Sequence, residues 1–307
     1  GLLSSLVHGG KQKEDRTGVG TKSVFGRILR HDMSAGFPLL TTRKIYWDNA
    51  VTELLWILQG KTDIKYLNDN GVKYWNADYE RSGRTDGTLG PVYGSQWRNF
   101  AGVDQLTQLI REIKSNPSSR RLMINAWNAG AIHDMALPPC HYGFQIYIND
   151  GKMDLMWQQR SADVFLGLPY DFAMYGLLLL MLAKGAGYTP GELLVSLGDC
   201  HLYNNHIDQA KQQLDRSFRK LPFVSVDRGL TIIEGGITIP TKEMINISGY
   251  NLKEKLHIAK NHLLPKSLLD HGINSSLVVD DDCLEEIIDS YTRESGVRGL
   301  GLGFRVR

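Results

Sequence analysis

An apolar segment at residues 170–187 limits the possible folds of this chain more than any other feature of its sequence. Its longest uninterrupted apolar run, Leu177 to Ala183, is far shorter than the roughly 20 residues that a membrane-spanning helix needs. The segment therefore predicts a helix buried in a protein core, and we expect no membrane contact. The segments on either side, residues 152–161 and 192–203, have patterns typical of strands.

Helices and strands are mixed along the chain rather than strictly alternating. The spacing of apolar residues predicts a short helix in the first part of residues 1–22. It predicts further helices at 47–70, 104–115, 170–187 and 204–218. Strands are predicted at residues 23–33, 120–128, 141–148, 152–161 and 192–203, with a turn at Asn149-Asp150-Gly151. Polar, glycine-containing stretches at residues 11–20 and 78–90 indicate surface loops. This mixture favours an α+β fold over a doubly wound sheet.

The pattern changes beyond about Lys242. Asn251 with Glu254, and Asp282 with Glu285, have the spacing of a capping box, in which two side chains bond the free N–H groups of a first helical turn. We therefore predict two more helices there. The chain is accordingly divided into a sheet-and-helix domain at residues 1–242 and a helical appendage at residues 243–307.

The composition excludes several classes of protein. The 35 Lys and Arg residues nearly balance the 33 Asp and Glu residues, so the net charge of +2 gives no reason to expect direct binding of nucleic acid. Three cysteines are too few and too far apart for a disulfide framework. The opening residues lack the basic and apolar regions of a signal peptide. We expect a protein of the reducing cytoplasm.

Cys140 is the first candidate for chemistry. It lies between a Pro-Pro pair and His141, at the start of a predicted strand. A thiol held next to an imidazole and within reach of arginines could have a lowered pKa and act as a nucleophile. A buried structural cysteine is an equally open alternative.

Four arginines at the ends of predicted segments form the second candidate group. A guanidinium group binds phosphate through two parallel hydrogen bonds, so these residues suit a phosphate-bearing ligand. Taken singly, each is more often a solvated surface residue. The group consists of Arg16, Arg120, Arg121 and Arg160, the last followed by Ser161.

Glu53 and Asp171 lie within apolar stretches, where a carboxylate is costly unless it is partnered or functional. Bonding to nearby backbone amides is the alternative for each of them. In the segment GDCHLYNNH, His201 and Tyr203 suit hydrogen bonds to a sugar hydroxyl. No second Cys or His cluster completes a recognised metal-ligand spacing, so we expect no metal.

Together these motifs resemble the thymidylate synthase family. The resemblance covers roughly residues 1–240 and implies an α+β homodimer with a thymidylate synthase-like sheet-and-helix domain. It also implies transfer of a one-carbon unit from 5,10-methylenetetrahydrofolate to C5 of a pyrimidine deoxynucleoside monophosphate. The motifs, in chain order, are EDRTGVGTKSVFG, GFPLLTTRK, ELLWILQGKTDI, GPVYGSQWR, SSRRLMINAWN, LPPCH, QQRSADVFLGLPYD and GDCHLYNNHIDQ.

The resemblance assigns roles residue by residue. Cys140 resembles the nucleophile that attacks C6 of the base, Glu53 the glutamate that organises proton transfers, and Tyr93 the tyrosine that assists proton removal at C5. For the nucleotide bound in the same subunit, the resemblance implies phosphate contacts from Arg16, Arg160 and Ser161. It implies contacts to the 3′-hydroxyl from His201 and Tyr203. Arg120 and Arg121 resemble the pair that reaches the partner subunit's phosphate site. The folate-side positions are Arg43, Asp163 and Gly167.

Asp171 is the main departure from the thymidylate-forming members, which carry Asn at this position. An Asn amide matches O4 and N3–H of uracil, whereas a protonated Asp can donate to N3 of cytosine and accept from its N4 amino group. The residue thus resembles that of the phage deoxycytidylate 5-hydroxymethyltransferases, so we expect 5-hydroxymethyl-dCMP as product. Thymidylate synthesis from dUMP and methylation of dCMP stay open, as does a ribose in the substrate. If the chain is phage-encoded, we expect it in the host cytoplasm.

The C-terminal part resembles a second family. Residues 243–300 resemble the helical ATPase lid of Lon proteases, with Arg298 at the lid's nucleotide-sensing position. The chain has no GxxxxGK[ST] motif, so the lid is not half of a working ATPase here. We interpret the segment as a fusion. A catalytically impaired nucleotide-binding protein is therefore a further alternative, since the family closes its C-terminal tail over the folate.

Overall fold

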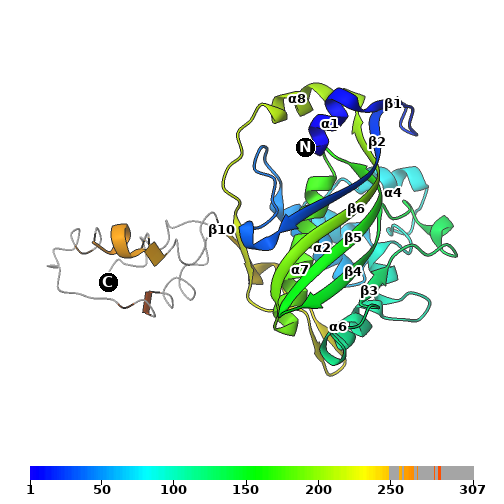
Figure 1. Ribbon diagram of the computed structural model, residues 1–307. Coiled ribbons are helices and arrows are strands. Elements are labelled where there is room, and N and C mark those ends of the chain that lie inside the picture. Colours follow the sequence, from blue (N-terminus) through cyan, green and yellow to red (C-terminus); the bar gives the residue numbers. More distant parts are fainter. Residues whose placement is uncertain (249–255, 258, 266–267, 269–279, 281–282, 285–307) are drawn as a thin grey trace.

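The computed structural model describes residues 1–248 together with residues 256–257, 259–265, 268, 280 and 283–284 (Figure 1). Its centre is a six-stranded sheet with the strand order β1-β2-β6-β5-β4-β3. All neighbouring strands are antiparallel except β5 and β6, which are parallel. The strands are β1 Lys11–Lys13, β2 Thr21–Asp32, β3 Met123–Asn125, β4 His141–Asn149, β5 Lys152–Asp163 and β6 Thr189–Tyr203. The predicted α+β class is confirmed.

The hairpin between β4 and β5 turns where the sequence predicts it. Asp150 and Gly151 have φ angles of 48° and 73°, and a two-residue hairpin turn of type I′ requires positive φ at both of its central residues. The ladder then pairs Asn149 with Lys152 and continues toward His141 opposite Gln159. This register places the start of β4 beside the end of β5.

Helix α7, Leu168–Ala186, is the predicted buried helix. It packs with α2, Trp47–Leu58, against one face of the sheet (Figure 1). Near its C-terminal end, Gly185 meets Gly229 and Leu230 backbone to backbone: a Cβ added at Gly185 would lie 1.9 Å from the Leu230 carbonyl oxygen. Near the middle of the helix, the Tyr175 ring stacks on Trp157 of β5 at 4.8 Å.

Smaller elements surround this core. The remaining helices are α1 Leu2–Gly9, α3 Ile64–Asp69, α4 Asn76–Ser82, α5 Tyr93–Arg98, α6 Gln105–Ser115 and α8 Ile207–Leu214. Two short sheets pair β7 Phe223–Val226 with β10 Ile245–Ser248, and β8 Thr231–Ile233 with β9 Gly236–Thr238. Short turns of 3₁₀ helix are η1 Met33–Ala35, η2 Ile132–Asp134, η3 Asn204–His206 and η4 Lys242–Met244, and Ala259–Leu263 forms a π-helix.

Several predicted elements differ from the structure. The helix predicted at 47–70 is two helices, because Gly60 adopts φ +71° and Asp63 caps a new start by accepting the Tyr66 N–H at 2.8 Å. The loop predicted at 78–90 is wrong at its beginning, which is part of α4. The strand predicted at 120–128 is limited to β3, and the loop predicted at 11–20 contains β1.

The predicted C-terminal helices are largely beyond what the structure describes. Their capping residues, Asn251 with Glu254 and Asp282 with Glu285, lie outside the described residues, as does Arg298. Strand β10 lies past Lys242 and pairs with β7. In the described part of the chain, no helix combines the length and apolar character needed to cross a bilayer.

Candidate active site

Cys140 lies directly before β4 and is held on two sides. Its backbone N–H donates to the Tyr93 hydroxyl at 2.9 Å, and its carbonyl accepts from the Arg160 N–H at 2.9 Å. The Arg160 guanidinium also donates to the carbonyls of Pro138 and Pro139, both at 2.9 Å, and its Nη2 lies 3.9 Å from the Cys140 Sγ. A cation therefore lies next to the thiol and fixes the Pro-Pro segment that presents it.

The lowered pKa that we expect for Cys140 from its imidazole and arginine neighbours is not found. Burial raises the pKa of Cys140, the charge of Arg160 opposes that rise, and Arg16 opposes it more weakly. The His141 ring is buried, stacks on Tyr93 at 4.3 Å and bonds the Tyr175 hydroxyl at 2.9 Å through Nδ1. Burial lowers the pKa of His141 to about 3, so the ring is neutral. The two arginines, not the imidazole, favour the thiolate.

Asp171 lies in the first turn of α7 and is bonded to the sheet by Gln159. The Trp157 indole N–H donates to Gln159 Oε1 at 3.0 Å, and Gln159 Nε2 donates to Asp171 Oδ2 at 2.8 Å. Burial raises the pKa of Asp171 to about 7, and the negative charges of Glu53 and Asp163 add to this rise. Near neutral pH the carboxyl is therefore poised between its protonated and ionised forms.

Glu53, on α2, is bonded by two consecutive residues of the segment that leads into α4. Tyr74 donates its hydroxyl to Oε2 at 2.7 Å, and Trp75 donates its indole N–H to Oε1 at 2.6 Å. Burial raises the pKa of Glu53, whereas these two bonds lower it. Glu53 is also close enough to Tyr93 and Asp171 to raise the pKa of each. The structure therefore brings Glu53, Tyr93, Cys140 and Asp171 into one site.

The predicted sugar and phosphate ligands lie around the ends of β5 and β6. The rings of His201 and Tyr203 meet edge to face at 5.3 Å on β6. Ser161 of β5 is half-buried and pairs with Asp199 of β6, two residues before His201. Arg16 lies exposed in a loop that Asp15 orders by accepting the N–H groups of Thr17 and Gly20 at 2.8 Å each. Its charge acts on both Cys140 and Tyr203, so it faces the same site.

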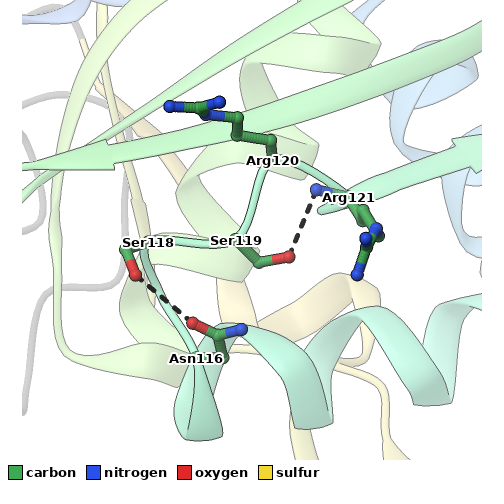
Figure 2. Close-up of a pocket in the computed structure, with 5 residues that line it drawn as sticks. All are labelled: Asn116, Ser118, Ser119, Arg120 and Arg121. Carbon is green, nitrogen blue, oxygen red and sulfur yellow. Dashed lines mark hydrogen bonds between the residues drawn. The ribbon is translucent and has the colours of Figure 1, made fainter.

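Arg120 and Arg121 are not brought to Cys140 of their own chain. They lie in the loop before β3, on a pocket of about 430 Å³ that they line with Asn116, Ser118 and Ser119 (Figure 2). The Arg120 carbonyl accepts from Gln145 Nε2, and Gln145 lies five residues along the chain from Cys140, about 17 Å at the rise of a strand. The two side chains point away from each other in Figure 2.

The predicted folate-side residues meet at the turn before α7. Asp163 Oδ1 accepts the N–H groups of Phe165 and Leu166 at 3.0 Å each, and Gly167 is the N-cap of the helix. The Arg43 guanidinium donates to the Phe165 carbonyl at 2.6 Å and lies 5.3 Å from the centre of its ring. Arg43 Nε is buried without a hydrogen-bond partner in the described structure. The structure thus brings Arg43, Asp163 and Gly167 together at this turn.

Comparison with known protein families identifies the family of the chain. The family model described as thymidylate synthase matches residues 1–260. The chain belongs to the thymidylate synthase family. Membership supports a transferase that moves a one-carbon unit from methylenetetrahydrofolate, as co-substrate, to a pyrimidine nucleotide. Among the described residues, no group of three or more His, Cys, Asp or Glu side chains could hold a metal ion.

A second family model, the Lon protease AAA+ ATPase lid domain, matches residues 270–301. The match to the thymidylate synthase family thus extends past Lys242, and the lid match begins well after it. Both families that the sequence resembles are therefore among the matches. The predicted division after residue 242 stays a prediction.

Four residues of this family member's site were missed at the sequence level: Tyr74, Trp75, Trp127 and Gln159. The Trp127 ring lies 5.6 Å from the guanidinium carbon of Arg160. For Gln159 a signal existed, because alternate residues of β5 are buried and apolar up to Trp157, and the next position on that face is a glutamine. A buried polar side chain in an apolar row needs partners, and here one of them is Asp171.

Proposed function

We propose that this member of the thymidylate synthase family converts dCMP and 5,10-methylenetetrahydrofolate into 5-hydroxymethyl-dCMP and tetrahydrofolate, with water as the third reactant. One observation carries the choice of base: a half-buried Asp171 that Gln159 fixes in the same site as Cys140.

The hydrogen bonds around Asp171 favour cytosine. An indole N–H can only donate, so Gln159 must turn its oxygen to Trp157 and its NH₂ to Asp171 Oδ2. When Asp171 is protonated, its proton therefore belongs on Oδ1. Such a carboxyl can donate to N3 of cytosine and accept from the N4 amino group. Uracil presents the opposite pattern, and an ionised Asp171 opposite its O4 carries a mismatch of about 1–3 kcal/mol.

The proposed reaction uses the chain's own groups as follows. The Cys140 thiolate bonds to C6 of the base, which makes C5 nucleophilic, and it leaves again when the product forms. The co-substrate supplies the added carbon at the oxidation level of formaldehyde. Tyr93 and Glu53 assist removal of the C5 proton, and Glu53 orders the water whose oxygen becomes the hydroxyl group. No hydride leaves the folate, so the reaction involves no net oxidation or reduction.

We also propose a homodimer that shares its phosphate sites. In this arrangement Arg16, Arg160 and Ser161 bind the phosphate in their own subunit, and Arg120 and Arg121 reach that of the partner. The distance of Arg120 from Cys140 within one chain supports this arrangement. So do the exposed apolar side chains that the sheet carries on Phe25 and Ile28 of β2 and Tyr147 of β4, since a second copy could cover them.

The deciding experiment is a competition. The protein is incubated with methylenetetrahydrofolate and equal amounts of dCMP and dUMP, and the products are identified by mass. We expect 5-hydroxymethyl-dCMP, no rise in dihydrofolate absorbance, and no product from the Cys140→Ala variant. Thymidylate or 5-methyl-dCMP would overturn the proposal in favour of hydride transfer. Nucleotide binding without any product would instead indicate an impaired enzyme.

A further inference from the structure

The two hydrogen bonds to Glu53 come from side chains with different surroundings. Trp75 is 7% exposed, and its indole lies 6.2 Å from the Trp56 ring and 6.0 Å from the Tyr93 ring. Core packing therefore fixes Trp75 whether or not Glu53 is present. Tyr74 is 47% exposed, so its ring lies at the protein surface and only its hydroxyl end reaches inward to Glu53.

The Tyr74 hydroxyl is a permanent donor. Burial of its hydroxyl end raises the pKa of Tyr74 well above its usual value, and the nearby charge of Glu53 raises it further. The hydroxyl thus stays protonated at any pH at which the protein works. Its hydrogen is directed at Glu53 Oε2, because that oxygen lies 2.7 Å away.

The groups that face Glu53 come from three directions. Tyr74 and Trp75 precede α4, Tyr93 begins α5, and Asp171 begins α7. In the part of the chain that the structure describes, no Lys or Arg forms an ion pair with Glu53. The ionised carboxylate therefore depends on its two hydrogen bonds, and Asp171, when ionised, works against it.

We propose that Tyr74 is a positioning residue, which holds the Glu53 carboxylate ionised and turned toward the site so that it can accept a proton from water. In this role Tyr74 acts through Glu53, to which its hydroxyl is bonded. The inference rests on the proposed function in one respect, namely that Glu53 takes part in proton transfer.

The test is the Tyr74→Phe variant, which removes only the hydroxyl. Protein labelled with ¹³C at the glutamate side-chain carboxyl is titrated by NMR, and the Glu53 signal is assigned by its absence from Glu53→Gln. We expect the midpoint of the Glu53 titration to rise in Tyr74→Phe. In turnover of dCMP we expect kcat to fall about tenfold, since a hydrogen bond to a charged group is lost. KM should change little, and the acid limb of the rate profile should move to higher pH.

Tyr79→Phe is the matched control. Its hydroxyl accepts the Gly87 N–H at 3.0 Å, so this variant loses one tyrosine hydrogen bond in α4 that does not involve Glu53. We expect its Glu53 midpoint to equal that of the unmodified protein. An unchanged midpoint in Tyr74→Phe, or an equal shift in both variants, would overturn the inference. Because the titration needs no turnover, it decides the role of Tyr74 even if no 5-hydroxymethyl-dCMP is formed and the proposed function fails.

Discussion

Gln159 on β5 donates its Nε2 to Asp171 Oδ2 on α7 across 2.8 Å, and the indole of Trp157 determines which end of the glutamine faces the carboxyl. Oδ2 is thereby fixed as an acceptor, with a second lone pair left for the N4 amino group of the base, and Oδ1 is left to carry the proton that is donated to N3. In the proposed function, this fixed orientation lets Asp171 distinguish the hydrogen-bond pattern of cytosine from that of uracil.

Asp171→Asn should change the preferred base. The amide can donate to O4 and accept from N3–H, so it favours uracil over cytosine. From a mismatch of about 1–3 kcal/mol we expect the ratio of kcat/KM for dCMP over dUMP to fall by roughly 5- to 150-fold. Steady-state kinetics with both nucleotides measure this ratio. Asp208→Asn, which alters an exposed carboxylate in α8, is the control, and a ratio that falls equally in both variants would contradict the assignment.

The free energy of unfolding should depend on pH through the ionisation of Asp171. Burial raises the folded-state pKa of its carboxyl to about 7, whereas an unfolded chain gives about 3.9. The folded state therefore holds the proton more tightly. The resulting stabilisation is present below about pH 4 and is lost progressively as pH rises to about 7. Urea unfolding between about pH 5 and about pH 7 should show a steeper loss of unfolding free energy with pH for the unmodified protein than for Asp171→Asn. Parallel curves for the two would mean that Asp171 ionises normally.

Arg160→Gln should make Cys140 less reactive. The variant removes the cation whose Nη2 lies 3.9 Å from Sγ, so the pKa of Cys140 should rise further above its usual value. We expect alkylation of Cys140 by iodoacetamide at neutral pH to slow by about tenfold, read by mass spectrometry of the Cys140 peptide so that Cys200 and Cys283 do not interfere. Arg30→Gln, which breaks the exposed ion pair with Glu192, should leave the rate unchanged. A rate unaffected by Arg160→Gln would show that this guanidinium does not support the thiolate.

Shared phosphate sites predict complementation between two inactive chains. A chain with Arg120→Ala and Arg121→Ala keeps its own Cys140, and a Cys140→Ala chain keeps both arginines. Random reassortment makes half of the dimers mixed, and each mixed dimer has one complete site, so activity should return to about a quarter of the unmodified level. Each variant alone stays inactive. Full activity of the double arginine variant alone would contradict a shared site.

The sequence predicts best those features that depend on residues close to one another in the chain. The turn at Asn149-Asp150-Gly151 and the buried helix follow from residues next to one another. The expected pKa-lowering effect of His141 on Cys140 was wrong because the His141 ring lies in the core, where burial keeps it neutral. Helix α4 was missed because its polar sequence NADYERS has no apolar spacing. The bond between Gln159 and Asp171 joins a strand to a helix, and such a contact appears only after folding.

The close backbone approach of Gly185 to Gly229 and Leu230 has a consequence at the other end of α7. Asp171 lies on the same helix about 21 Å from Gly185, since 14 residues with a rise of 1.5 Å each separate them. A side chain at position 185 must displace either α7 or the Gly229–Leu230 segment, and a displaced α7 would carry Asp171 with it relative to Gln159. In the proposed function, the packing of Gly185 against Gly229 and Leu230 therefore affects the position of the carboxyl that selects the base.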